Sequence, residues 1–272
     1  MDRRVEQDEP PTRRMETGMS QQARTPALSP DAVRDELQFL LSLEHALLIE
    51  YLTIYCALGV DLPFEEGGPS DDGSPVASAA FNLALFQMGR LARFTPVAGV
   101  PDAGNIDRAT SIPGPDGATI SLEPLGIEQL RDVLGTAEAI ARATDARYAA
   151  LEPHVQGPAF DEDVRTAVQG GQGHLSRVQD NLRDALGALH PADLLRATRR
   201  EGTTANENAL LNASDLVYNL LLEQFTNQHR APDDETSTTF RFMARRSMDL
   251  MKDTHLALAH LGLLPPFTLS FF

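Results

Sequence analysis

The feature that most constrains this chain is a long apolar segment with a carboxylate at its centre. Residues 37–59 read LQFLLSLEHALLIEYLTIYCALG, and their large apolar side chains recur at helical spacing. The stripe consists of Leu37, Leu40, Leu41, Leu47, Leu48, Tyr51 and Tyr55, with Glu44 in the middle of it. A buried carboxylate needs a cation, a proton or a metal ion as its partner. The sequence therefore predicts a core helix with a polar centre at Glu44.

Two carboxylates argue against a membrane position for this segment. Glu44 and Glu50 would each cost roughly 2–3 kcal/mol at the centre of a bilayer, so a helix buried in a soluble protein is favoured. Cys56 is the single cysteine of the chain, which excludes an intrachain disulfide and fits a reducing compartment. No apolar segment follows the basic N-terminus as it would in a signal peptide. We therefore expect a cytoplasmic protein without a membrane partner.

Helical patterns dominate the rest of the chain. Ser29 and Pro30 are typical of an N-cap and a first helical turn, so the apolar helix is predicted to start there and to end at Gly59. Further helices are predicted over residues 76–97, 127–151, 162–189, 206–229 and 238–262. The glycines of QGGQG at 169–173 should weaken or kink the helix at 162–189. Long helices joined by loops, with little strand patterning, predict an all-α bundle.

Two other segments lack helical signals. Residues 99–125 form a long connection rich in Gly and Pro, with one short strand expected at 118–122. Residues 1–29 contain almost no large apolar side chains and cannot bury enough surface to offset chain entropy. We therefore expect a disordered N-terminal tail over residues 1–29 and one helical domain over residues 30–272.

The charge of the chain limits its partners. It has 39 acidic and 23 basic residues, which give a net charge of −16. Such a surface cannot neutralise phosphates along a nucleic acid, so nucleic-acid binding is excluded as a function. The sequence also lacks a Walker A loop, a dinucleotide-binding fingerprint, a nucleophile elbow and a zinc-protease helix. A small molecule is the expected partner, and a homodimer stays open.

The helix at 76–97 supplies two polar candidates for the centre of the bundle. Gln87 and Arg90 lie three residues apart and so share a face, among Leu, Ala and Phe side chains. An arginine in such surroundings needs an anionic partner, and Glu44 is a natural one; the alternative is that Arg90 extends to the rim of the bundle. For Glu44, the alternative to a catalytic role is a structural salt bridge or a hydrogen bond to a tyrosine.

Five further residues are candidates for a pocket in the bundle. His174 follows the glycine-rich segment 169–173, where another backbone or a substrate can approach closely. Glu50 borders the apolar stripe and either pairs with a neighbouring helix or faces the pocket. His255 lies on an apolar stripe of the helix at 238–262 and is more typical of a core histidine. The remaining two candidates are Tyr51 and Glu223.

Several segments resemble a known family. Residues 37–59 resemble the first helix of the ferritin-like family typified by iminophenyl-pyruvate dimer synthase, which serves bacterial pigment pathways. ISLEPLGIEQLRDVL at 120–134 resembles that family's linker into its third helix, and QGGQGHLSRVQDNL at 169–182 and LALAHLGLLPP at 256–266 are similar to later parts of it. The likeness is collinear over about residues 33–266. It implies a ferritin-like helical bundle with additional helices.

The metal ligands of that family are altered here. Its members hold iron with glutamates and histidines from several helices, and the resemblance places Glu44 at the glutamate of the first helix. Gln87 and Arg90 stand where the family has a Glu-x-x-His pair, and the family's later Gln-Gly-Glu-Gly element reads QGGQG at 169–173, without its glutamate. The resemblance places His174 at the later histidine. Because a guanidinium cannot ligate a cation, we expect no metal and no other cofactor.

These observations favour a metal-independent tailoring enzyme of bacterial specialised metabolism. It would promote a non-redox condensation or cyclisation of a small aromatic intermediate, such as closure of an iminium onto an aromatic ring. The expected catalytic residues are Glu44, Arg90 and His174. The expected substrate-binding residues are Gln87, Tyr51, Glu50, Glu223 and His255. Two alternatives stay open: an iron-dependent oxygenase or oxidative coupling enzyme of the ferritin-like type, and a non-catalytic binding protein of such a pathway.

Overall fold

A computed structural model describes most of the helical part of the chain. The described residues are 28–58, 75–98, 106–107, 111–113, 119–121, 130–187, 201–264 and 269–270. The predicted disordered tail lies outside them, apart from Leu28 and Ser29, and so does most of the connection at 99–125. The described residues thus comprise the bundle and the short strands attached to it.

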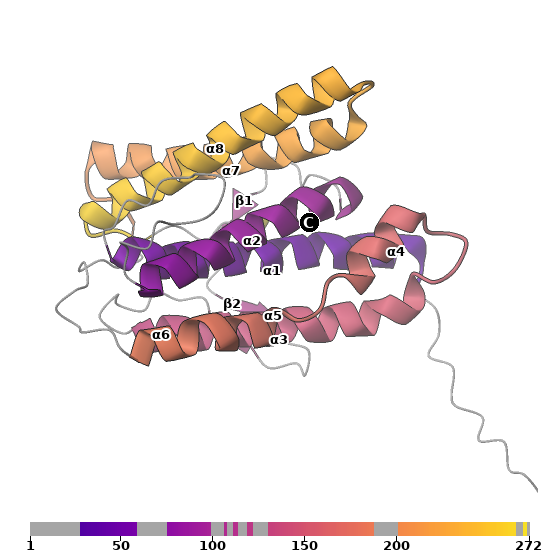
Figure 1. Ribbon diagram of the computed structural model, residues 1–272, viewed down its shortest axis with the longest axis horizontal. Coiled ribbons are helices and arrows are strands. Elements are labelled where there is room, and N and C mark those ends of the chain that lie inside the picture. Colours follow the sequence, from indigo (N-terminus) through magenta and orange to yellow (C-terminus); the bar gives the residue numbers. More distant parts are fainter. Residues whose placement is uncertain are drawn as a thin grey trace, which may run out of the picture.

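The described part of the chain is all-α apart from short strands (Figure 1). The helices are α1 (Pro30–Ala57), α2 (Pro75–Ala98), α3 (Leu130–Leu151), α4 (Glu162–Gln169), α5 (His174–Val178), α6 (Asp184–Gly187), α7 (Ala205–Arg230) and α8 (Asp234–His260). A 3₁₀ turn follows α3 at Glu152–His154, and a π-helical turn at Gln179–Arg183 joins α5 to α6. The strands are β1 (Ile106–Asp107), β2 (Ser111–Pro113), β3 (Thr119–Ser121) and β4 (Leu269–Ser270). β3 is the strand expected at 118–122; it pairs antiparallel with β2, and β1 pairs antiparallel with β4.

Helix α1 is the centre of the fold. Its start is the predicted one, with Pro30 in the first turn and the side chain of Ser29 accepting a hydrogen bond from the amide of Ala32. Figure 1 shows α7 and α8 on one side of α1 and α2, and α3, α5 and α6 on the other. Because α1 has neighbours on both sides, every residue from Leu40 to Ala57 is buried, including those outside the predicted stripe.

The burial of α1 also bears on whether this helix could span a membrane. Among the described helices, α1 alone is long and apolar enough to cross a membrane, and 94% of its most apolar stretch is buried inside the fold. Length and composition do not separate a membrane-spanning helix from the central helix of a packed bundle, because both need a long apolar surface.

The predicted helix at 162–189 is divided rather than kinked. Helix α4 ends at Gln169, and α5 begins only at His174. A Cβ on Gly171 would lie 2.1 Å from the ring of Tyr148, so the segment can pass this ring only as glycine. Gly173 has a φ of +96°, a backbone conformation that residues with a Cβ rarely adopt. The glycines therefore turn the chain and bring His174 against the bundle.

Helices α7 and α8 form an antiparallel pair whose ends are set by side-chain caps. Thr204 and Glu207 form a capping box at the start of α7, each side chain bonding the other residue's backbone amide. Asp233 caps α8 by accepting a hydrogen bond from the amide of Thr236. This cap explains why α8 begins at Asp234 rather than at the predicted residue 238.

Candidate functional site

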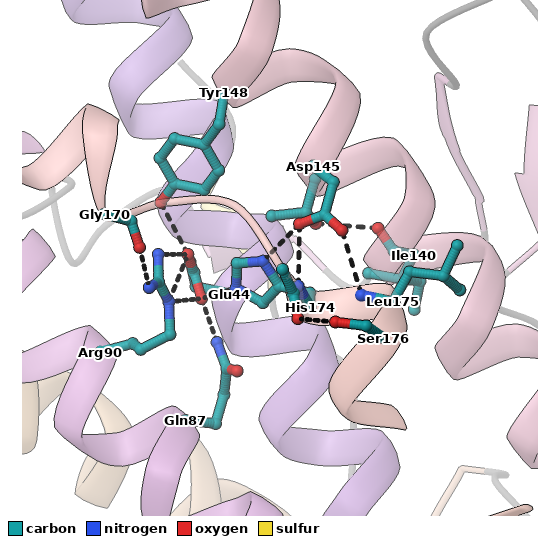
Figure 2. A network of polar contacts seen from close by, with 12 residues as sticks. Glu44, Gln87, Arg90, Ile140, Asp145, Tyr148, Gly170, His174, Leu175 and Ser176 are labelled. Carbon is teal, nitrogen blue, oxygen red and sulfur yellow. Dashed lines mark hydrogen bonds and ion pairs between the residues drawn. The ribbon is translucent and has the colours of Figure 1, made fainter. Parts of the chain in front are cut away.

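Glu44 lies at the centre of a buried polar network that joins four helices (Figure 2). Its Oε1 accepts hydrogen bonds from the hydroxyl of Tyr148 at 2.6 Å and from Nη2 of Arg90 at 2.9 Å. Its Oε2 accepts from the side-chain amide of Gln87, and Nε2 of His174 lies 3.1 Å away. Nε of Arg90 is 3.2 Å from both oxygens. The predicted ion pair of Glu44 with Arg90 is thereby confirmed.

Both carboxylate oxygens of Glu44 are engaged by neighbouring side chains. A carboxylate offers about four lone-pair sites, and the donors of Gln87, Arg90, Tyr148 and His174 occupy them. Burial alone would raise the pKa of Glu44, but the charges and hydrogen bonds of His174 and Arg90 outweigh burial and hold that pKa well below its ordinary value. Glu44 is therefore a permanent, fully hydrogen-bonded anion, which does not favour the catalytic role predicted for it.

His174 lies between two carboxylates. Its Nε2 faces Glu44 at 3.1 Å, and its Nδ1 faces Oδ1 of Asp145 at 2.8 Å. Because both ring nitrogens must donate to satisfy both carboxylates, the imidazole carries two protons. Burial alone would lower the pKa of His174, but the charge of Glu44 and the hydrogen bonds to Asp145 and Glu44 raise it to about 8. Two cations, Arg90 and His174, thus balance two anions, Glu44 and Asp145.

Asp145 also fixes the start of α5. Its Oδ1 accepts a hydrogen bond from the amide of His174 at 2.9 Å, and its Oδ2 accepts from the amide of Leu175 at 3.1 Å. A carboxylate at this position satisfies the free amides of the first helical turn and the positive end of the helix. Gly173, the residue before α5, supplies no side-chain cap of its own. One side chain of α3 therefore holds both the backbone and the ring of His174.

Sequence reasoning missed two members of this network, Asp145 and Tyr148. Both lie on α3, three residues apart, so both can face α1. Tyr148 is fully buried, and burial together with the charge of Glu44 raises its pKa, which keeps the hydroxyl protonated as a donor. The sequence did contain a signal for Tyr148, because Tyr148 continues a stripe of buried residues on α3 formed by Ala137, Ala141 and Thr144.

The residues predicted from sequence divide into three groups. Glu44, Gln87, Arg90 and His174 meet in the network, and Tyr51 is buried beside it on α1, where burial and then the charges of Glu44 and Asp145 raise its pKa. Glu50 is buried further along α1. His255 and Glu223 lie in the layer of α7 and α8, outside the network.

His255 is a core histidine, the more typical of its two predicted roles. It is 1% exposed, and its Nε2 shares a hydrogen bond with the hydroxyl of Ser214 at 2.6 Å. His45 of α1 lies on the same side of the bundle and stacks on Tyr218, with ring centroids 3.5 Å apart. Burial, aided by His45, lowers the pKa of His255 to about 3. Glu223, by contrast, is exposed on α7.

A cavity of about 410 Å³ adjoins the network between α2, α4 and α7. Arg90 and Gly170 belong to both, because Nη1 of Arg90 donates to the carbonyl oxygen of Gly170 at 2.6 Å and both residues line the cavity. Its other lining residues are Ala92, Arg93, Phe94, Pro96, Val97, Asp163, Thr166, Ala167, Phe225, Gln228 and His229. His229 and Asp163 face each other, with Nε2 and Oδ2 3.7 Å apart. These cavity residues other than Arg90 were not predicted from sequence.

Comparison with known proteins found no relative of this chain. No family model, no curated protein and no solved structure matches the chain. The likeness to ferritin-like proteins therefore rests on four similar segments of the sequence alone.

Two of the buried histidines, His174 and His255, predict opposite responses of stability to pH. His255 has a folded-state pKa of about 3 against an ordinary value of 6.5, so the unfolded chain binds more protons between these values and stability falls as the pH drops through this range. His174 has a raised pKa, so its contribution is present below pH 6.5 and is lost as the pH rises through about 8. Chemical unfolding at several pH values measures both effects.

The loss of stability at acid pH can be assigned to His255 with one variant. Between pH 6.5 and 5 we expect the wild type to lose about 2 kcal/mol more than His255→Gln, since each pH unit below the unfolded pKa contributes about 1.4 kcal/mol. The matched control is His260→Gln, because His260 is exposed on the same helix. If the unfolding free energies of wild type and His255→Gln fall in parallel as the pH drops, the loss of stability at acid pH has another origin.

Proposed function

We propose that the protein is a metal-independent enzyme built on a ferritin-like bundle, and that it promotes a non-redox condensation or cyclisation of a small molecule in the cavity beside Arg90. One observation carries this proposal. The guanidinium of Arg90 is bonded on its inner side to the buried Glu44, while the same side chain lines a cavity of about 410 Å³. The network thus presents a fixed cation to a space large enough for a small organic molecule.

Iron does not fit the residues at the centre of this bundle. The carboxylate of Glu44 uses its oxygens to accept hydrogen bonds, and the positive charges of Arg90 and His174 lie on both sides of it. A metal cation would have to displace both. Among the residues that the structure describes, no group of three or more His, Cys, Asp or Glu side chains has the geometry of a metal site. The iron-dependent alternative is therefore less well supported.

The geometry supports a different division of roles from the one expected from sequence. Arg90 would bind an anionic group or polarise a carbonyl of the substrate. Glu44, Gln87, His174 and Tyr148 would be positioning residues that hold the guanidinium in place. Proton transfer would fall to His229 and Asp163, whose side chains are 51% and 65% exposed at the cavity.

One feature favours a second candidate, a binding protein without catalytic activity. The acid and base groups of the network, Glu44, His174 and Tyr148, are 0–2% exposed and are not part of the cavity lining. A bundle that only binds a ligand needs the cation and the cavity but no accessible acid or base. The two candidates differ in whether a bound compound is turned over.

The absence of iron is the first test. After expression in iron-supplemented medium, elemental analysis of the purified full chain should find iron far below one atom per chain. Added chelator should leave the thermal unfolding midpoint unchanged, because no part of the network depends on a metal. One or more tightly bound irons per chain, with a lower midpoint after chelation, would overturn the metal-free proposal in favour of the oxygenase alternative.

Turnover is the second test, and it separates enzyme from binding protein. Phenylpyruvate and dopamine condense to an iminium with loss of water; closure forms a carbon–carbon bond to the ring, and the ring carbon then loses its proton. Product formation measured by mass spectrometry should be faster with the protein than in buffer. We expect His229→Gln to lower this rate roughly 100-fold or more if it removes the base, and His260→Gln to leave it unchanged. Binding without acceleration would favour the second candidate.

A further inference from the structure

We propose that the outer face of α7 and α8 is an interface between two copies of this chain, which pack antiparallel about a two-fold axis at the middle of α8. The inference goes beyond the proposed function and does not depend on the cavity. Figure 1 shows α7 and α8 as the outermost layer on their side of α1 and α2. The outer face comprises Leu216 and Leu220 of α7 and Phe242, Met243, Arg246, Asp249, Leu250 and Asp253 of α8.

Large apolar side chains are exposed together on this face. Leu216 and Leu220 are 68% and 41% exposed on α7. On α8, Phe242, Met243 and Leu250 are 63%, 44% and 52% exposed. These five are most of the seven large hydrophobic residues that are exposed in the described part of the chain. An exposed apolar patch of this kind is typical of an interaction surface, because leaving it in water is unfavourable.

The register of the two helices joins these side chains into one patch. Ser247 of α8 donates a hydrogen bond to Gln224 of α7 at 2.8 Å, which fixes the antiparallel pairing. Leu220 precedes Gln224 by about one helical turn, and Leu250 follows Ser247 by about one turn, so the two leucines lie at the same level. Met243 is two turns before Leu250 on the same side of α8. The patch therefore runs across the groove between the helices.

The charges on α8 favour a second copy in antiparallel orientation. Arg246 and Asp249 lie at the middle of α8, and their side chains are 88% and 34% exposed. A two-fold axis there brings Arg246 of each copy beside Asp249 of the other, so two cations meet two anions. The same axis places Phe242 of each copy against Leu250 of the other. Residues 241–253 include four basic and two acidic side chains, which reduces the repulsion between two copies that each have a net charge of −16.

The outer face is large enough for a dimer contact. Helix α8 has 27 residues, so it is about 40 Å long, and two helices side by side are about 20 Å wide. Two such faces can bury the roughly 1,000 Å² in total that a specific interface needs. Because charged side chains interrupt the patch, we expect a dimer that dissociates at about micromolar concentration rather than an obligate one.

Sedimentation velocity of the full chain, from about 1 to 100 μM, tests the interface. We expect the wild type to shift from monomer to dimer over this range. Leu250→Glu puts two carboxylates into the apolar contact and should raise the dissociation constant at least tenfold. Leu28→Glu is the matched control, because Leu28 is also exposed, at 41%, but precedes α1; it should leave the dissociation constant unchanged. Urea unfolding shows whether each monomer keeps its fold.

A charge exchange tests the antiparallel arrangement. Arg246→Asp leaves four carboxylates near the axis and should weaken the dimer at least tenfold. Adding Asp249→Arg to the same chain restores two cations and two anions, so the double variant should dimerise within about threefold of the wild type.

Three results would overturn the proposal, and none of them involves turnover in the cavity. A wild type that stays monomeric at about 100 μM would leave the outer face to a different protein. A dimer that is unaffected by Leu250→Glu would lie on another surface. A double variant that associates no more tightly than Arg246→Asp would show that the two copies do not meet in the antiparallel arrangement.

Discussion

Glu44→Gln should cost the fold about 3–5 kcal/mol of unfolding free energy, because it leaves the two cations of the network, Arg90 and His174, with Asp145 as their one remaining counter-charge. The side chain of Glu44 is fully buried, and the change replaces one acceptor oxygen with an amide that must face donors from Gln87, His174 or Arg90. His174 loses the charge that raises its pKa, so its pKa should fall below the wild-type value of about 8. Urea unfolding measures the first effect, and NMR titration of the imidazole measures the second.

The control is the same substitution in an ion pair near the surface. Glu36 accepts from Nη1 of Arg147 at 2.7 Å, and the two side chains are 27% and 19% exposed. Because water remains available to both partners, Glu36→Gln should cost less than about 1 kcal/mol. If Glu44→Gln keeps its stability but loses turnover roughly 100-fold or more, Glu44 is an acid or base after all and the structural role is wrong.

The polar centre of the bundle could be predicted in part, because a charged side chain on the apolar face of a helix can be recognised from the sequence of that helix alone. An unpaired Glu44 in an apolar stripe is costly, and an arginine on the inner face of the next helix is equally costly, so each points to the other. The pairing of His174 was harder to predict. It depends on Asp145, an ordinary acidic residue of α3 that meets His174 only after the chain turns at Gly173.

The cavity could not be predicted from sequence for a related reason. Its lining comes from α2, α4 and α7, and Arg93, Asp163 and His229 look like ordinary exposed charges on their own helices. Asp163 comes from α4, which ends at Gln169, so its place at the cavity belongs to a short helix that the sequence did not predict. Glu223 and His255 are the converse case. Their residue types suggested a site, but α7 and α8 pack as a separate layer in which Glu223 is exposed and His255 is a core residue.

Gly171→Ala should destabilise the fold by about 3 kcal/mol or more, the upper end of the usual cost of overpacking. The added Cβ would lie 2.1 Å from Cδ1 of Tyr148, and this ring cannot move without losing its hydrogen bond to Glu44. Tyr148 is fully buried, and its ring contacts Phe94 edge to face and stacks on His174, so a shift of the ring would disturb both neighbours. The effect should also reach the cavity, because Gly170 and Arg90 are joined by a hydrogen bond next to the altered residue.

The matched control has the opposite expected sign. Gly135 lies within α3, and a Cβ there would meet nothing within 4 Å. Because alanine favours the helix and restricts the unfolded chain, Gly135→Ala should stabilise the fold by roughly 0.5–1 kcal/mol. Thermal and urea unfolding of both variants would test the pair. The prediction would be contradicted by a small loss of unfolding free energy for Gly171→Ala together with an unchanged, raised pKa of His174. That result would show that Tyr148 can shift without loosening Glu44. It would also show that α3 can approach the start of α5 without a glycine at position 171.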